Sequence, residues 1–324
     1  MYHTKIKHAL IIHPLKKGTV IKSTGSWYTV IDSETQKSIL CNIRGKLRIK
    51  GIKSTNPVAV GDHVDFFIPE NSKTGIIKNL LPRKNYIIRK STNLSKQTHV
   101  IAANIDQAVL MITLKNPVTY SIFIDRFLIT AEAYGIPAKL IFNKIDLYND
   151  KEKQLLNEYI KAYELAGYEC IQTSVTQKIN IEKTTYLLKN KITLIAGNSG
   201  VGKSSLINLI DPTLSLKTNE ISSYHKSGKH TTTFAEMFDL SVGGRIIDTP
   251  GIRGFGLHDI EKEELFHYFP EIFEASKNCK YYNCTHVHEP GCAVKIAVEE
   301  NKIHPMRYHN YLNILLDKET KHRL

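Results

Sequence analysis

Residues Gly197-Asn198-Ser199-Gly200-Val201-Gly202-Lys203-Ser204 give the strongest indication of fold in this chain of 324 residues. It fits in full the pattern of a phosphate-binding loop, in which glycines, a lysine and a serine stand at fixed spacing. An apolar run at residues 192–196 precedes it and a helical pattern at 203–209 follows it. This is the strand–loop–helix context that the motif requires. The sequence therefore predicts an α/β domain that binds a nucleotide.

Each part of this stretch suits phosphate. The glycines let backbone N–H groups point at phosphate oxygens from the N-terminus of a helix. Lys203 is expected to reach the β- and γ-phosphates and Ser204 to bind Mg²⁺. Downstream, Asp248 follows an apolar run and can hold Mg²⁺ through water, and the N–H of Gly251 can meet a γ-phosphate. The candidate phosphate-binding residues are Gly197, Asn198, Ser199, Gly200, Val201, Gly202, Lys203, Ser204, Ser205, Asp248 and Gly251.

A second motif, Asn143-Lys144-Ile145-Asp146, ends the apolar run at 139–142 and predicts which base is bound. The Asp146 carboxylate can accept hydrogen bonds from the N1–H and the 2-amino group of guanine, a pattern that adenine does not offer. Asn143 can contact the other edge of the base, and the stem of Lys144 can lie over the ring. Ser174 belongs to the weaker base-supporting loop expected next. We therefore expect GTP rather than ATP.

The order of these motifs along the chain is permuted. In most GTPases the phosphate loop comes first and the base motif last, whereas here the base motif at 143–146 precedes the phosphate loop at 197–204. Circular permutation is tolerated when the native termini lie close together. The segment after Gly251 then leads directly into the C-terminal part, so nucleotide state could move that part.

A polar loop between the two phosphate motifs holds the stretch 228–233, with three threonines. A threonine here can bind Mg²⁺ and sense the γ-phosphate, as in switch I of other GTPases. Thr231, Thr232 and Thr233 are the candidates for Mg²⁺, and the sequence does not say which of the three acts. Ile252 stands where many GTPases carry a glutamine that orients water, so we expect slow intrinsic hydrolysis and a partner that completes the site. His230 is the nearest polar substitute, and an ordinary loop histidine remains the alternative.

The rest of the chain divides into regions by pattern. Residues 1–16 are expected to be a disordered extension, and 17–95 an OB-fold domain that binds RNA. Residues 96–278 should form the permuted GTPase domain, and 279–324 a zinc-binding and helical C-terminal domain. Short strands are expected at 19–23, 27–32, 38–43, 63–68 and 75–80. In the GTPase region strands are expected at 108–113, 139–142, 169–173, 191–196, 236–240 and 244–247, with helices at 123–134, 151–166 and 203–209.

Charge separates the first region from the others. The net charge of the chain is +13, and residues 1–95 hold 17 Lys/Arg against 5 Asp/Glu, a net of +12. Such a concentrated basic excess is the electrostatic footprint of a protein that binds a phosphate backbone. A basic face that only confers solubility is the plainer alternative.

Three of the five cysteines lie close together near the C-terminus. Cys279, Cys284, His286 and Cys292 form a set suited to one tetrahedral structural Zn²⁺, although His288 could replace His286. Unliganded reduced thiols are the alternative. A helix is expected from Pro305, with apolar spacing through Leu315. No apolar run is long enough to cross a membrane, and an odd number of cysteines favours a reducing compartment, so we expect a cytoplasmic protein.

These motifs in this order resemble the RsgA family, also called YjeQ or YloQ, of circularly permuted GTPases that depend on the small ribosomal subunit. The resemblance covers nearly the whole chain after residue 16. Beyond the motifs above it rests on Gly18-Thr19-Val20, on the stretch 41–48 and on Val60-Gly61-Asp62. It implies an OB-fold, a permuted GTPase core and a zinc domain. The histidine proposed as catalytic in the family corresponds to His230.

The resemblance also implies a role in late maturation of the small (30S) ribosomal subunit. GTP would favour binding to its 16S rRNA, and hydrolysis stimulated by the subunit would favour release. We expect a monomer. Two other hypotheses remain: an RNA-binding protein whose nucleotide site is only structural, and an ATP-dependent kinase or ATPase. Lys203, Ser204 and Asp248 argue against the first, and Asp146 argues against the second.

Overall fold

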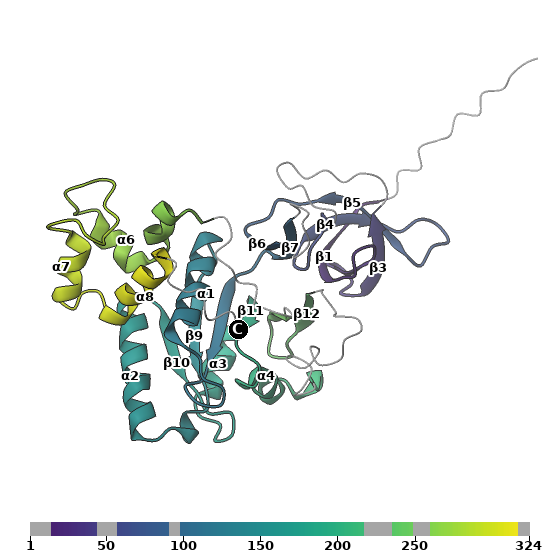
Figure 1. Cartoon of the computed structure of the whole chain (residues 1–324). Coiled ribbons are helices and arrows are strands. Elements are labelled where there is room, and N and C mark those ends of the chain that lie inside the picture. Colours follow the sequence, from purple (N-terminus) through teal and green to yellow (C-terminus); the bar gives the residue numbers. More distant parts are fainter. Residues whose placement is uncertain (1–13, 44–56, 91–97, 217–234, 249–259, 317–324) are drawn as a thin grey trace, which may run out of the picture.

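The structure is a computed structural model, and it describes residues 14–43, 57–90, 98–216, 235–248 and 260–316. Figure 1 shows three parts: a small barrel, a central sheet flanked by helices, and a helical C-terminal part on the side of the sheet away from the barrel. The barrel and the central sheet share one continuous sheet of eleven strands. Among the described residues, no helix is long and apolar enough to cross a membrane.

The N-terminal part is a closed five-stranded barrel, as predicted. Its strands are β1 (Lys16–Ser23), β2 (Tyr28–Asp32), β3 (Ser38–Ile43), β4 (His63–Phe67) and β5 (Gly75–Leu80). The order β1-β2-β3-β5-β4 closes on itself because β1 also pairs with β4. Alternate residues point inward, and the barrel core contains Val20, Val30, Val64 and Phe66. The basic stretch 44–48 lies outside the described residues.

A strand pair that the sequence did not reveal connects the barrel to the rest of the chain. Strands β6 (Tyr86–Lys90) and β7 (Thr98–Ala103) run antiparallel on either side of the boundary predicted at residue 95. The N–H of Ala103 donates to the Val60 carbonyl over 2.8 Å. The buried Asn104 amide donates to the Gly61 carbonyl over 2.9 Å. These bonds fasten the barrel directly to the segment that enters the central sheet.

The central sheet is a doubly covered α/β sheet, as the alternating pattern predicted. Its strands are β8 (Gln107–Ile112), β9 (Ala138–Phe142), β10 (Glu169–Gln172), β11 (Ile192–Ala196), β12 (Glu236–Asp239) and β13 (Arg245–Asp248). The spatial order is β10-β9-β8-β11-β13-β12, and only β12 runs antiparallel. Its helices are α1 (Ser121–Ala133), α2 (Asp150–Leu165), α3 (Ile181–Leu188) and α4 (Lys203–Ile210).

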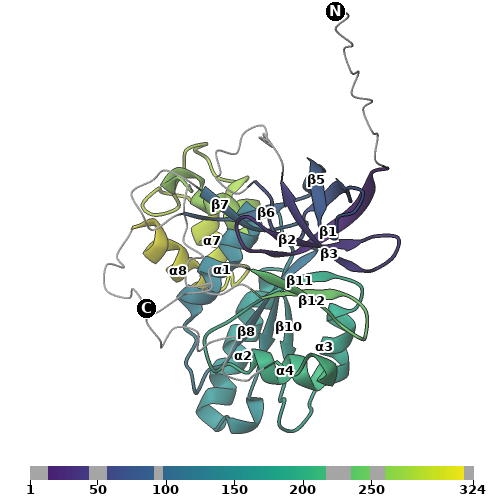
Figure 2. The ribbon, with the colours of Figure 1, turned by 90° about the vertical axis from the view of Figure 1, so that its right-hand side faces the viewer.

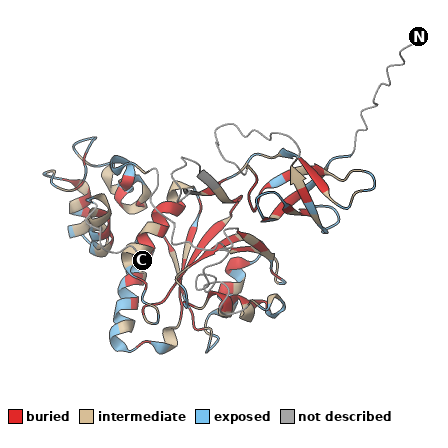
Figure 3. Cartoon of the chain, turned by 45° about the vertical axis from the view of Figure 1, so that its right-hand side comes forward, coloured by how far each residue is buried: buried red, intermediate tan, exposed pale blue. Residues whose placement is uncertain are grey.

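Side chains of β8 alternate between two cores, which shows how the sheet is covered. Leu110 and Ile112 pack in one core with residues of α1 and α2, while Val109 and Met111 pack in the other with residues of α3 and α4. All six residues of β8 are buried, as expected for a strand with helices on both faces. Figure 3 shows this burial along the strands of the central sheet and the exposed outer side of α2.

The path of the chain confirms the permutation. It enters the sheet in the middle at β8, moves outward through β9 to β10, and returns to β11 on the other side of β8. The strand that precedes the base motif therefore comes earlier in the chain than the strand that precedes the phosphate loop. Because these strands are parallel, their carboxyl ends still meet at one edge.

The C-terminal part is helical and has its own core. It comprises η4 (Lys262–Tyr268), α6 (Pro270–Ser276), α7 (Ala293–Glu299) and α8 (Pro305–Leu315). The helix predicted from Pro305 is present. Leu265 and Ile272, which precede the boundary predicted at residue 278, share one core with Val294 and Tyr311 beyond it. The cysteine and histidine cluster lies in the same part.

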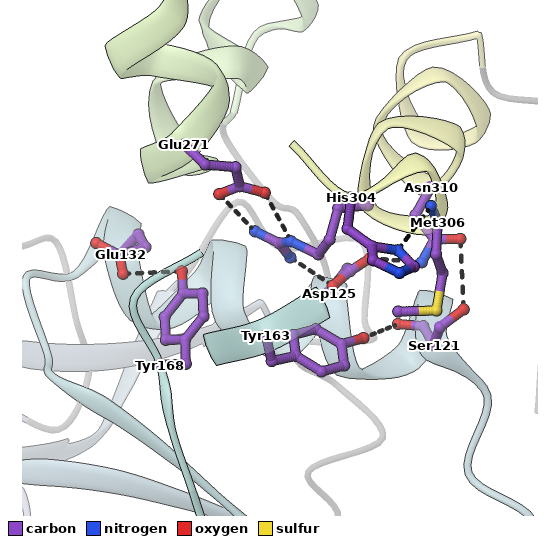
Figure 4. A network of polar contacts seen from close by, with 10 residues as sticks. Ser121, Asp125, Glu132, Tyr163, Tyr168, Glu271, His304, Met306 and Asn310 are labelled. Atoms are coloured by element: carbon purple, nitrogen blue, oxygen red, sulfur yellow. Dashed lines mark hydrogen bonds and ion pairs between the residues drawn. The ribbon is translucent and has the colours of Figure 1, made fainter. Parts of the chain in front are cut away.

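A buried ion pair network joins the C-terminal part to the central sheet (Figure 4). Arg307 of α8 pairs with Asp125 of α1 and, through Nε at 2.7 Å, with Glu271 of α6. The Asn310 amide also donates to Asp125. Although burial opposes it, the carboxylates of Asp125 and Glu271 hold the pKa of Arg307 above its usual value. The ring of Phe269 lies 4.6 Å from the guanidinium. This network fixes α8 against α1.

Candidate functional site

The phosphate loop between β11 and α4 has a backbone that only glycine can adopt. Gly197, Gly200 and Gly202 have φ angles of 144°, 85° and 102°. A Cβ on Gly197 would lie 2.5 Å from the backbone oxygen of Met111, and one on Gly202 would lie 2.6 Å from the Asn143 amide nitrogen. Side chains at Gly197 and Gly202 are excluded both by conformation and by space, whereas at Gly200 the positive φ alone disfavours a side chain. The loop thus has the backbone conformation that a phosphate cradle requires.

Lys203, the first residue of α4, is buried within this loop. Its ammonium group donates to the carbonyls of Gly197 at 2.7 Å and Asn198 at 3.0 Å. Burial lowers the pKa of Lys203 to about 8, and the nearby Asp248 carboxylate opposes this shift. A phosphate oxygen is a stronger, charged acceptor than either carbonyl. Lys203 is therefore placed beside the loop's backbone, where a bound phosphate would attract it.

Asp248 ends β13 directly beside the strand that leads into the phosphate loop. It is paired in register with Ile195 of β11, and it lines one small cavity together with Lys203 and Ile207. Burial raises the pKa of Asp248 to about 6; Lys203 opposes the shift and the Glu236 carboxylate adds to it. Ser204 is also buried, next to Lys203 at the start of α4. These positions bring the two predicted Mg²⁺ residues to the same edge of the sheet.

The base motif is joined to the phosphate loop through Asn143. The Asn143 amide donates to the Val201 carbonyl over 2.8 Å, and its oxygen accepts from the Thr173 hydroxyl over 3.1 Å. The Tyr148 hydroxyl donates to the Asn143 carbonyl over 2.8 Å. Asn143 is buried, so these bonds are made away from water. The predicted contact of Asn143 with the base is thus accompanied by a role that sequence reasoning missed, namely joining three loops.

In the rest of the base motif, the Asp146 carboxylate is available to a ligand. Lys144 adopts a left-handed conformation with φ of 62°, and its ammonium donates to the Asn116 carbonyl over 2.6 Å. Asp146 is half-buried in the short helix η1 (Ile145–Leu147). Its carboxylate accepts no hydrogen bond from any residue that the structure describes. The neighbouring Ser174 is fully buried and accepts from the Gln177 N–H over 3.0 Å. Asp146 can therefore offer both oxygens to a ligand.

Five predicted site residues lie outside the described residues: His230, Thr231, Thr232, Thr233 and Gly251. Their assigned roles stay predictions.

The cysteine and histidine cluster has the geometry of a closed metal site. The ligand atoms of Cys279, Cys284, His286 and Cys292 all lie within 4.8 Å of one another. The Cys279 and Cys292 sulfurs are 3.9 Å apart, and the Cys292 sulfur is 3.5 Å from His286 Nδ1. Tetrahedral zinc with ordinary bond lengths requires separations of about 3.8 Å between sulfurs and about 3.6 Å between sulfur and nitrogen. The four residues therefore fit a metal ion of this kind.

Hydrogen bonds to Glu289 and from Tyr308 hold the loop that carries this cluster in shape. The Glu289 carboxylate accepts from the Thr285 N–H at 2.7 Å and from the Val287 N–H at 3.0 Å. It also accepts from the Thr285 hydroxyl at 2.8 Å. The Tyr308 hydroxyl of α8 donates to the His286 carbonyl over 2.6 Å. Although burial opposes it, these N–H and O–H donors lower the pKa of Glu289 to about 2. Glu289 and Tyr308 thus orient the loop that carries the cluster.

Comparison with known families agrees with this geometry. Residues 80–258 match the RsgA GTPase family and residues 17–77 match the RsgA N-terminal domain. The chain belongs to the RsgA family.

The similarity to relatives and to solved structures extends over almost the full length of this RsgA-family chain. The "Small ribosomal subunit biogenesis GTPase RsgA" of Phocaeicola vulgatus is 55% identical over 303 residues, which cover 94% of this chain and 97% of the relative. The protein of the same name from Christiangramia forsetii is 55% identical over 310 residues, covering 95% and 98%.

Two solved structures are similar in fold and sequence. The crystal structure of YjeQ from Thermotoga maritima has a TM-score of 0.76 at 36% identity, covering 95% of this chain and all of that one. The structure of YloQ, described as a circularly permuted GTPase, has a TM-score of 0.73 at 31% identity and covers 98% of this chain. The permuted order deduced from the motifs is therefore shared with solved RsgA-family proteins.

Sequence reasoning missed several residues that shape this RsgA-family site. Tyr148 bridges the strand ends, since its hydroxyl accepts from the Leu114 N–H at 2.8 Å and donates to Asn143. Asn116 anchors Lys144 through a backbone carbonyl, which no side-chain pattern reveals. Glu289 stands three residues before Cys292, so the sequence does show an acidic residue among the candidate metal ligands. Its hydrogen bonds could be assigned only once the loop was known.

Proposed function

We propose that this RsgA-family protein binds GTP, hydrolyses it, and acts in the late maturation of the small ribosomal subunit. The observation that carries the proposal is the hydrogen bond between Asn143 and Val201, because it joins the predicted guanine-reading loop to the phosphate loop. The relatives at 55% identity are named for biogenesis of the small ribosomal subunit. Their similarity over nearly the whole chain supports the same role here.

In this proposal, each part of GTP is bound by particular residues of the site. The Asp146 carboxylate accepts from the N1–H and 2-amino groups of guanine, and the Lys144 stem lies along the ring. Ser174 supports this loop. Backbone N–H groups of residues 197–205 and the Lys203 ammonium hold the phosphates.

Mg²⁺ would be held by Ser204, by Asp248 through water, and by one switch threonine among Thr231, Thr232 and Thr233. When bound, it neutralises negative charge on the β- and γ-phosphate oxygens. The Gly251 N–H would meet the γ-phosphate, and His230 would orient the water that attacks the γ-phosphorus while GDP leaves. The site lacks a glutamine at Ile252, so we expect turnover to be slow until the small subunit completes it.

The metal cluster is proposed to hold one structural Zn²⁺. Cys279, Cys284, His286 and Cys292 would supply three thiolates and an imidazole nitrogen. A closed set of four protein ligands leaves no position for a reacting water. The ion would therefore stabilise the C-terminal core and take no part in hydrolysis.

The basic barrel is proposed to bind rRNA. Residues 1–95 carry a net charge of +12, while the rest of the chain is nearly neutral. In this proposal the GTP-bound protein binds the 16S rRNA of the small subunit in the cytoplasm as a monomer, and hydrolysis favours release. The proposed parts are the barrel at 17–95, the GTPase domain at 96–278 and the zinc domain at 279–324, after an extension at 1–16. Residues 262–276, at the end of the second range, pack in the core of the zinc domain.

Multiple-turnover GTP hydrolysis tests this function. Phosphate release is measured with purified small subunits, with large subunits and with neither, for the wild type and Lys203→Ala. We expect stimulation by small subunits alone and its loss in the variant. An RNA-binding protein with a structural nucleotide site would release no phosphate in any of the mixtures. Equal turnover with both subunits would contradict the proposed partner.

A further inference from the structure

One exposed contact links the barrel directly to the strand beside the nucleotide site. Lys22 of β1 pairs in register with Glu236 of β12, and this pair joins the barrel strands to the central sheet. The Lys22 ammonium lies 2.9 Å from a Glu236 carboxylate oxygen. Figures 1 and 2 both place β12 next to the barrel. The neighbouring Ile21 packs against the core that contains Ala235 and Met237.

The other side of β12 faces the nucleotide site. Glu236 is also paired in register with Asp248 of β13. Lys22, Glu236 and Asp248 therefore stand in a row across three adjacent strands. Because neighbouring strands lie about 4.8 Å apart, the backbone of Lys22 is about 10 Å from that of Asp248. The Glu236 carboxylate is thus placed to interact with a barrel cation on one side and with the nucleotide site on the other.

The two contacts between barrel and sheet differ in how easily they can change. The hydrogen bonds from Ala103 to Val60 and from Asn104 to Gly61 are made by buried residues. The Lys22 and Glu236 side chains are 46% and 41% exposed. An exposed ion pair is weak and open to competition from another anion. Phosphate of RNA bound to the basic barrel is such an anion.

We propose that the Lys22–Glu236 pair couples RNA binding on the barrel to nucleotide binding at Asp248. The inference rests on the proposed function. When an RNA phosphate pairs with Lys22, Glu236 loses its partner, and its carboxylate adds negative charge beside the Mg²⁺ site. This strengthens the hold on Mg²⁺ and GTP. By reciprocity, Mg²⁺ and GTP release Lys22 for RNA, so the GTP state binds RNA more tightly than the GDP state. Lys22 and Glu236 are positioning residues in this scheme.

The test compares the affinity of purified small subunits for the protein saturated with GDP or with a non-hydrolysable GTP analogue. Glu236→Gln should tighten binding in the GDP state, because Lys22 no longer has a competing partner. Lys22→Gln should weaken binding mainly in the GTP-analogue state. Each change should reduce the ratio between the two affinities by about two- to fivefold. The double variant should reduce it no further than either single one.

Lys17→Gln is the matched control, since it removes an equally basic, exposed side chain from the same strand. It should weaken both nucleotide states alike and leave the ratio unchanged. The inference is overturned if Glu236→Gln fails to tighten the GDP state, or if Lys22→Gln behaves like Lys17→Gln. The proposed function itself is rejected if the wild type binds small subunits equally in both nucleotide states and its rate of GTP hydrolysis does not change when subunits are added.

Discussion

The side-chain amide of Asn143 donates to the backbone carbonyl of Val201, although these residues are 58 positions apart in the chain. A Cβ on the next residue, Gly202, would lie 2.6 Å from the same amide nitrogen. The two loops are therefore in direct contact with no side chain between them. One loop has the residues to identify guanine and the other has those to hold phosphate. Their contact places both around one nucleotide in spite of the permuted chain order.

Asn143→Ala should weaken GTP binding by about tenfold or more. The substitution leaves the buried Thr173 hydroxyl and the Val201 carbonyl without this partner, and each loss costs about 1–3 kcal/mol. Titration with a fluorescent GTP analogue measures the effect. Asn79→Ala is the control, since the exposed Asn79 side chain lies on β5 of the barrel and donates to Asp65 over 3.1 Å. Equal affinities of the two variants would show that the Asn143 contact does not organise the site.

Nucleotide binding should depend on the ionisation of Asp248. Its pKa is raised from 3.8 to about 6, chiefly by burial. A raised carboxyl pKa means that the folded protein holds the proton more tightly, so this group's contribution to stability is present at low pH and lost as pH rises through about 6. The ionised form, which Mg²⁺ requires, is present above about pH 6. The affinity for GTP is measured in the presence of Mg²⁺ for the wild type and for Asp248→Asn. The ratio of the wild-type affinity to the variant affinity should rise as the pH rises from about 5 to about 7.5.

That ratio removes the titration of the nucleotide's own phosphates, which affects both proteins equally. A ratio that stays constant across this pH range would contradict the assignment of Asp248 to the metal.

Arg307→Met should destabilise the helical C-terminal part. It removes a buried cation from Asp125 and Glu271, and breaking such a pair costs about 3–5 kcal/mol. The only tryptophan, Trp27, directly precedes β2 of the barrel. We expect the urea transition seen by far-UV circular dichroism to move to lower concentration while the tryptophan fluorescence transition stays in place. Lys277→Ala, which removes an exposed pair with Glu274, should change neither transition. An unshifted dichroism transition in Arg307→Met would show that the network does not hold α8.

Glu289→Gln should weaken metal binding without affecting nucleotide binding. It removes the negative charge from a group that accepts from Thr285 and Val287 in the loop between the metal ligands. Loss of such an orienting group costs about 10–100-fold in metal affinity. Competition with a chromogenic zinc chelator measures this. Glu299→Gln, an exposed change on α7, is the control.

Chelation of the metal from the wild type should loosen the C-terminal core and leave the affinity for GTP intact. Loss of GTP affinity on chelation would contradict a purely structural metal.

Local patterns predicted much of this structure because the information is local. The strand before Gly197 and the helix after Ser204 follow from one motif, and the helix beginning at Pro305 follows from proline and apolar spacing. Five short β-branched runs were enough to predict the closed barrel. The permuted order needed only the positions of two motifs, since parallel strands bring their loops to one edge of the sheet.

Features that depend on distant parts of the chain were not accessible in this way. Arg307 and Asp125 are 182 residues apart, and nothing in either neighbourhood marks them as partners. Strand β6 ends in the basic residues Arg89 and Lys90, and its partner β7 follows only after residues 91–97, so the local pattern does not indicate their pairing. The helix α3 is only eight residues long and carries β-branched residues, which weaken a helical pattern. The fold of 262–276 into the C-terminal core was hidden because its apolar partners come later in the chain.

The base preference of Asp146→Asn tests whether one guanine nucleotide bridges the loop at 143–146 and the loop at 197–204. Asparagine replaces one acceptor oxygen by a donor, which suits the extra carbonyl of xanthine and not the 2-amino group of guanine. Affinities for GTP, xanthosine triphosphate and ATP are measured for the wild type and the variant. We expect the wild type to prefer GTP and the variant to prefer xanthosine triphosphate. A variant that keeps the wild-type preference for GTP would contradict this expectation.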